Sequence, residues 1–131
     1  EALEKINAEV RSYLAGEWEG DSWPLHVGGK GVLWNRDFSY PGRSLGRREC
    51  HHLRRVFSKL PWTVRRMVVG HSVQSEVNAE CSGAVWRVDV GMSRGVRDAA
   101  PQVLEIMADG RVEVLDEKTR ASGRKRRRDA G

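Results

Sequence analysis

One histidine of the sequence stands where a metal ligand would be expected. The run VVGHSVQ places His71 directly after an apolar stretch and Gly70. Functional groups of α/β proteins gather where the strands of a sheet end, and a glycine there lets the backbone turn sharply. A neutral imidazole at such a position can bind a metal ion. On spacing alone, a histidine with a structural role, whose ring is hydrogen-bonded within the fold, is slightly favoured over a metal ligand.

Two other side chains could assist such a histidine. The segment WRVDVGMSRG again runs from a strand into an acid and a glycine, which puts Asp89 at the end of a candidate neighbouring strand. An aspartate there can orient a metal-bound imidazole through its second nitrogen, or it can cap the loop that follows. In LWNRD, Arg36 could grip a phosphate oxygen, although an ion pair with Asp37 or another surface acid is the commoner outcome.

His51, His52 and the two cysteines do not form a metal site. His51 and His52 are consecutive residues of a predicted helix, so their side chains point about 100° apart and cannot bind one ion. Cys50 and Cys81 are the only cysteines, and neither belongs to a CxxC pair. Two cysteines are too few for a disulfide-built scaffold, so we predict two reduced, partly buried thiols in a reducing compartment.

Hydrophobic spacing predicts the elements that must position these residues. Residues 2–15 form one amphipathic helix, and residues 45–60 form a second, capped by Ser44 and ended by Pro61. The predicted strands are 66–70, 84–91 and the hairpin QVLEIM–RVEVL, with a loop holding Asn78 and Cys81 between the first two. Two helices followed by four strands indicate an α/β or α+β domain.

Length and charge exclude several classes of protein. The 131 residues fit one domain and contain no apolar run long enough to span a membrane. Residues 117–131 hold seven Lys or Arg and two Asp or Glu, which accounts for the net charge of +5 and leaves residues 1–116 neutral. The neutral body argues against nucleic-acid binding, and residues 117–131 are predicted to be a disordered basic tail.

Four motifs in a fixed order give the sequence a family resemblance. GVLWNRDFS, RRMVVGHSVQ, CSGAVWRVDVGMSRG and VLEIMADGRVEVL resemble the C-terminal half of the Shewanella-like protein phosphatases, which are calcineurin-like metallophosphoesterases. The resemblance covers about residues 1–116 and leaves the tail outside. It implies the C-terminal half of a β-sandwich flanked by helices. It also implies two metal ions (Mn, Fe or Zn) that polarise phosphoryl oxygens and activate a bridging water.

The resemblance assigns one metal ligand to this chain. His71 matches the family's C-terminal GH ligand, and Ser72 keeps a hydroxyl where the family usually has threonine. Asp89 and Arg36 fall in the DVGM and LWxRD segments, with no established role carried over. The Asp-x-His, Gly-Asp-x-x-Asp-Arg and Gly-Asn-His motifs of the family would all lie upstream of Glu1, so we expect this chain to be inactive in isolation.

Two functions of different classes follow. The first is the C-terminal segment of a dinuclear-metal phosphoesterase, a protein phosphatase acting on phosphorylated proteins or small phosphate esters. The alternative is a catalytically inactive, truncated phosphoesterase fold that serves as a protein-interaction module. The cysteine usage and the charged N-terminus predict an intracellular, cytoplasmic protein, while GRKRRR and the missing initiator Met leave nuclear or organellar destinations open.

Overall fold

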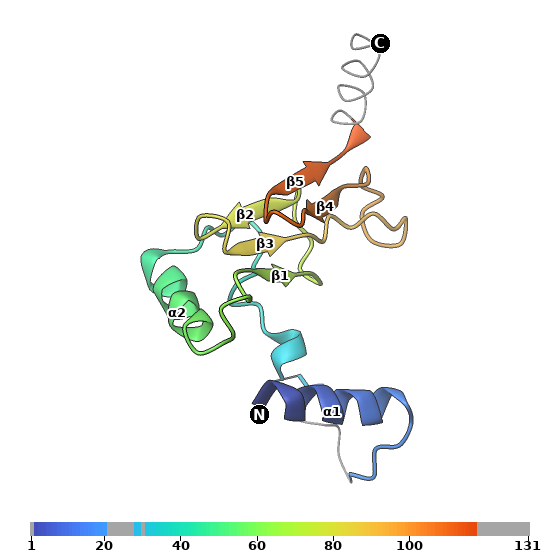
Figure 1. Cartoon of the computed structure of the whole chain (residues 1–131). Coiled ribbons are helices and arrows are strands. Elements are labelled where there is room, and N and C mark those ends of the chain that lie inside the picture. Colours follow the sequence, from blue (N-terminus) through green and yellow to red (C-terminus); the bar gives the residue numbers. More distant parts are fainter. Residues whose placement is uncertain (1, 21–27, 30, 118–131) are drawn as a thin grey trace. The chain divides into compact units, whose positions relative to one another are not determined.

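The chain divides into two compact units, residues 1–36 and 37–131. A computed structural model describes residues 2–20, 28–29 and 31–117 (Figure 1). Of the predicted basic tail, only residue 117 belongs to the described residues. In the first unit, α1 (Ala2–Leu14) confirms the predicted N-terminal helix, and a short 3-10 helix, η1, covers Val32–Trp34.

The second unit begins its regular structure with α2 (Arg47–Phe57). The helix starts after Gly46, whose backbone N–H donates a 3.1 Å hydrogen bond to the carboxylate of Glu49. The predicted cap at Ser44 is therefore wrong. The hydrogen bond from Gly46 to the Glu49 side chain makes Gly46 the residue before the helix, so the helix begins at Arg47. Leu53 is fully buried and anchors the helix to the unit.

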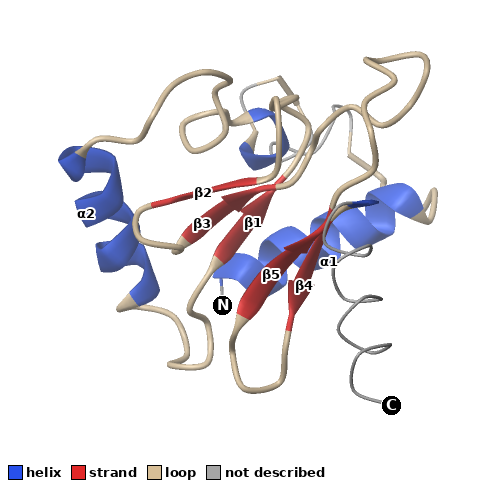
Figure 2. Cartoon of the chain, turned by 90° about the horizontal axis from the view of Figure 1, so that it is seen from above, coloured by secondary structure: helices blue, strands red, loops and turns tan. Residues whose placement is uncertain are grey.

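A three-stranded sheet follows, with the strand order β1-β3-β2 (Figure 2). The strands are β1 (Met67–Val69), β2 (Asn78–Glu80) and β3 (Val85–Arg87). β3 lies between a parallel partner, β1, and an antiparallel partner, β2. The loop predicted around Asn78 is wrong at this point, because pairing with β3 imposes a strand on residues with little preference for one.

The predicted hairpin is confirmed as a separate two-stranded sheet. β4 (Val103–Ile106) and β5 (Val112–Leu115) pair antiparallel, with Val103 opposite Leu115. Gly110 has a φ of +87°, which suits a glycine in the tight turn. The guanidinium of Arg66, next to β1, donates a hydrogen bond to the Gly110 carbonyl and so ties the hairpin turn to the start of the sheet.

One face of the three-stranded sheet is covered and the other is open. Val85 and Arg87 are buried on one face, whereas Val68, which lies beside Trp86 on the other, is 49% exposed. The described large apolar side chains that are buried are few: Leu53, Val77, Val85 and Val90. The predicted α+β fold is confirmed. None of the described helices is long and apolar enough to cross a membrane.

Cys50 and Cys81 form a disulfide bond, which overturns the prediction of two reduced thiols. Their Cα atoms lie 5.3 Å apart although 31 positions separate them in sequence. The bond connects α2 to the turn between β2 and β3, and the fold alone brings the two residues together. Because the reduced thiols were an argument for a reducing compartment, the cytoplasmic location stays a prediction that the structure does not support.

Candidate functional site at the ends of two parallel strands

The parallel pairing of β1 and β3 brings two candidate residues to one edge of the sheet. Val69 is the register partner of Arg87, and His71 and Asp89 each follow these residues by two positions. The backbone N–H of Gln74 donates a 2.7 Å hydrogen bond to the carbonyl of Asp89, which joins the segments after the two strands. The predicted adjacency of the two strands is confirmed.

His71 occupies the centre of a tight, strained turn. The N–H of Ser72 donates a 2.8 Å hydrogen bond to the carbonyl of Gly70, which closes a three-residue turn around His71. The φ of His71 is +67°, so the histidine itself, and not Gly70 as its sequence suggested, takes the left-handed conformation. Such a conformation costs on the order of 1–3 kcal/mol and tends to persist at functional sites. The imidazole is exposed.

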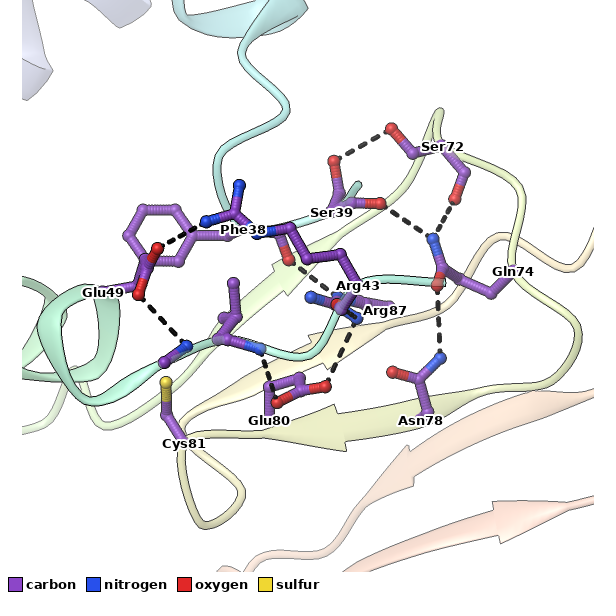
Figure 3. A network of polar contacts seen from close by, with 12 residues as sticks. Phe38, Ser39, Arg43, Glu49, Ser72, Gln74, Asn78, Glu80, Cys81 and Arg87 are labelled. Atoms are coloured by element: carbon purple, nitrogen blue, oxygen red, sulfur yellow. Dashed lines mark hydrogen bonds and ion pairs between the residues drawn. The ribbon is translucent and has the colours of Figure 1, made fainter. Parts of the chain in front are cut away.

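Ser39, Ser72 and Gln74 form a buried polar cluster next to this turn (Figure 3). Ser72 and Gln74 are each at most 5% exposed. The Gln74 amide donates to the carbonyls of Ser39 (2.8 Å) and Ser72 (2.7 Å), which uses both of its N–H groups. The hydroxyls of Ser39 and Ser72 also bond to each other. The turn is thus held both by Gln74, two residues after Ser72, and by Ser39 from a distant segment.

A second buried group, Arg87, clamps the segment that carries Ser39. Its guanidinium donates to the carbonyls of Phe38 (2.8 Å) and Arg43 (2.9 Å), and it lies 3.4 Å from the carboxylate of Glu80 (Figure 3). The other carboxylate oxygen of Glu80 accepts a 3.1 Å hydrogen bond from the N–H of Leu45. Only 3% of Arg87 is exposed. One sheet face therefore fixes residues 38–45 through two charged side chains.

Asp89 caps the loop that follows β3. Its carboxylate accepts a 2.9 Å hydrogen bond from the N–H of Gly91. Gly91 itself has a φ of +68°, and a Cβ there would come within 3.0 Å of Val73 and Arg97, so the loop packs tightly around a glycine. This geometry corresponds to the loop-capping alternative. Orientation of the His71 imidazole by Asp89 stays a prediction.

Arg36 is the last residue of the first unit, and its side chain is exposed. The predicted phosphate contact of Arg36 therefore rests on the LWNRD segment alone and stays a prediction.

The described residues do not fit a complete metal centre. Within residues 2–20, 28–29 and 31–117, no three His, Cys, Asp or Glu side chains lie together as a metal site requires. An exposed imidazole at the end of a strand fits one coordination position. His51 and His52 lie exposed on α2. Any metal bound through His71 needs further ligands.

The polar residues that hold the site were not found from the sequence. Gln74, Ser39 and Glu80 have no spacing that distinguishes them from surface residues. Arg87 did leave a signal, because it interrupts the apolar run AVWRVDV, and a cation at a core position of a strand needs buried partners.

The comparisons with known proteins support the resemblance to the phosphatases. The chain is 38% identical over 115 residues to Shewanella-like protein phosphatase 2 of Arabidopsis thaliana. This alignment covers 86% of the chain and 29% of the relative, so the chain spans about three tenths of that protein's length. No protein-family profile matches the sequence, and no solved structure matches it. The predicted similarity to Shewanella-like protein phosphatases is confirmed.

Proposed function

We propose, from the similarity of this chain to part of a Shewanella-like protein phosphatase, that it is the C-terminal segment of a dinuclear-metal phosphoesterase in which His71 binds one metal ion. The observation that carries this proposal is the turn at His71. Cys81, Ser82 and Asp98 also have positive φ, but His71 combines it with an exposed imidazole just beyond the end of β1 and a turn held by buried hydrogen bonds. Backbone strain of this kind is common at functional sites.

In this proposal, residues of this chain hold the imidazole of His71 in the position from which it binds the metal. Gln74 and Ser72 fix the backbone on which the imidazole stands, so the ligand is presented without having to be ordered on binding. The metal pair, when bound, would supply a polarised phosphoryl group and an acidified water. The substrates we propose are phosphorylated proteins or small phosphate esters, and the metals Mn, Fe or Zn.

The test is His71→Ala in the full-length protein that contains this chain. Bound metal is measured by elemental analysis, and hydrolysis of 4-nitrophenyl phosphate is measured with added manganese. We expect the loss of one metal ion and a fall in turnover of about 100-fold or more, since even residues that only orient a ligand contribute 10–100-fold. The free energy of unfolding should not fall, because an exposed, strained histidine contributes little to the core.

The matched control is His52→Ala, an exposed histidine on α2. It should keep both bound metal and turnover. If His71→Ala retains its metal and its turnover, then His71 is only a turn residue and the proposed assignment fails.

A second candidate function is supported by the open face of the sheet and by the absence of a three-ligand cluster in the described residues. In this alternative the chain is a truncated phosphoesterase fold that binds another protein through its uncovered sheet. A full-length protein that carries the upstream ligand motifs and hydrolyses phosphate esters would exclude it.

A further inference from the structure

We propose that the solvent-facing side of α2 is a docking surface for an acidic peptide segment of a partner protein. We call it the α2 basic surface, and its residues are Arg47, Arg48, Arg54 and Arg55 of the helix together with Lys59, two residues after its end. All five are exposed. Residues 47–66 hold seven Lys or Arg and a single acid, Glu49, although residues 1–116 as a whole are neutral. The basic charge is therefore concentrated in one short segment.

The helix arranges these arginines as a continuous patch. At about 100° per residue, the four arginines lie within about 120° of the helix circumference, on the side away from buried Leu53. Glu49 cannot neutralise them, because its carboxylate already binds the guanidinium of Arg43 at 2.6 Å and the N–H of Gly46. In the described part of the chain, none of the five residues of the α2 basic surface forms an ion pair.

Part of this charge pattern opposes the stability of the helix itself. Arg47 and Arg48 lie in the first turn, where the helix dipole disfavours a positive charge. Arg54 and Arg55 lie in the last turn, where the dipole favours a positive charge, so the cost is confined to the start of the helix. A surface that serves only solubility mixes both signs of charge. An anionic partner removes the penalty in the first turn.

The spacing of the patch suits an extended acidic peptide. Arg47 and Arg54, like Arg48 and Arg55, are two turns apart, roughly 10.5 Å along the axis. An extended chain advances by about 3.3 Å per residue, so acidic residues three positions apart match the two arginine pairs. Trp62 follows the helix, is 80% exposed, and has the Arg65 guanidinium 5.8 Å from its ring centroid. Tryptophan and arginine are the residues that most often dominate binding at protein interfaces.

Other anionic partners fit less well. A helix that lies on a membrane inserts its apolar side, but in α2 this side carries buried Leu53 and the disulfide of Cys50. A nucleic acid would also be attracted to a basic helix, but residues 1–116 as a whole are neutral, which argues against a nucleic-acid-binding domain. Figure 1 shows α2 at the end of the sheet where β1 and β3 begin, opposite the His71 turn. The surface is thus separate from the candidate metal ligand.

The experiment measures binding of a fluorescent peptide with glutamate at every third position to the full chain by anisotropy. We expect saturable binding that weakens with salt, and none to the glutamine version of the peptide. Arg48→Gln/Arg55→Gln should raise Kd by about fivefold or more, because each exposed arginine–carboxylate pair contributes roughly two- to fivefold. Glutamine favours helices, and an unchanged circular dichroism spectrum checks that α2 persists.

The matched control removes the same charge elsewhere, with Lys5→Gln/Arg94→Gln, and should leave Kd within about twofold, the change expected when no direct contact is lost. The basic residues of the C-terminal tail are present in every variant, so their contribution is constant. Equal weakening by the control pair would overturn the proposal. So would tighter binding, through the same arginines, to phosphatidylserine vesicles or to a single-stranded oligonucleotide. The assay involves neither metal nor hydrolysis, so its result is independent of the assignment of His71.

Discussion

The hydroxyl groups of Ser39 and Ser72 share a buried hydrogen bond of 2.9 Å across 33 positions of sequence. This contact joins the segment before α2 to the residue that follows His71. The turn at the end of β1 is therefore a product of the tertiary fold, since a side chain 33 positions away binds its last residue. The family's threonine at the position of Ser72 would keep the same hydroxyl.

Removal of either hydroxyl should destabilise the unit, and the two losses should not add. Ser72→Ala leaves the buried Ser39 hydroxyl without this partner and should cost about 1–3 kcal/mol in the free energy of unfolding. Ser39→Ala should cost a similar amount. The double variant should lose less than the sum, because both single changes break the same bond. Urea unfolding of the four proteins measures the coupling, and strictly additive losses would show that the hydroxyls do not interact.

Truncation of Arg87 should be among the most damaging changes in the chain. Arg87→Ala breaks the bonds to Phe38 and Arg43 and leaves the carboxylate of Glu80 without its cation. Loss of one partner from a buried ion pair costs about 3–5 kcal/mol. The exposed pair of Arg111 and Asp109 provides the control, and Arg111→Ala should cost about 0–1 kcal/mol. Comparable losses for the two arginines would contradict the role given to Arg87.

Removal of the disulfide should lower stability through the unfolded state. The bond closes a loop between residues 31 positions apart in the sequence. The lost entropy of the unfolded chain then stabilises the folded state by roughly 3–4 kcal/mol. Cys50→Ala/Cys81→Ala should therefore unfold at lower urea concentration, and a reducing agent should have the same effect on the parent chain. The reducing agent should not affect the double variant. If it destabilises that variant equally, the effect has another origin.

Acid should weaken the β4–β5 hairpin through Asp109. The backbone N–H of Arg111, and then its side chain, hold the pKa of Asp109 below its ordinary value of 3.8. The folded hairpin thus favours the charged carboxylate, so this contribution is present above pH 3.8 and is lost as pH falls through the lowered pKa. Asp109→Asn should remove this acid dependence. A carboxyl titration followed by nuclear magnetic resonance that places the midpoint above 3.8 would refute the assignment.

The elements that depend on local pattern could be predicted from the sequence. The apolar spacing of α1 and the Asp-Gly turn of the hairpin are signals carried by neighbouring residues, and both elements were found. The helix and the hairpin need no information about distant parts of the chain. The adjacency of β1 and β3 was inferred from the similar segments, a glycine near a polar residue, that follow the two strands.

The features that depend on distant residues could not be predicted. The sequence Asn78–Glu80 has no strand preference, and β2 exists because β3 offers a free edge. The pairing of Cys50 with Cys81 has no motif. Gly70 seemed the natural residue for positive φ, but the bonds of Ser72 and Gln74 place the left-handed conformation on His71 instead. Tertiary contacts decide each of these cases.

The disulfide has a mechanical consequence. Because it bypasses residues 51–80, a pull on the two chain ends passes from Cys50 to Cys81 through sulfur and not along the backbone of β1 or the His71 turn. Roughly 100 Å of extended chain stays hidden inside this covalent ring until the bond is reduced. Single-molecule stretching should therefore extend α1, β3 and the β4–β5 hairpin, which lie outside the ring, while β1 and the His71 turn feel the force only through their hydrogen bonds to β3 and to Asp89.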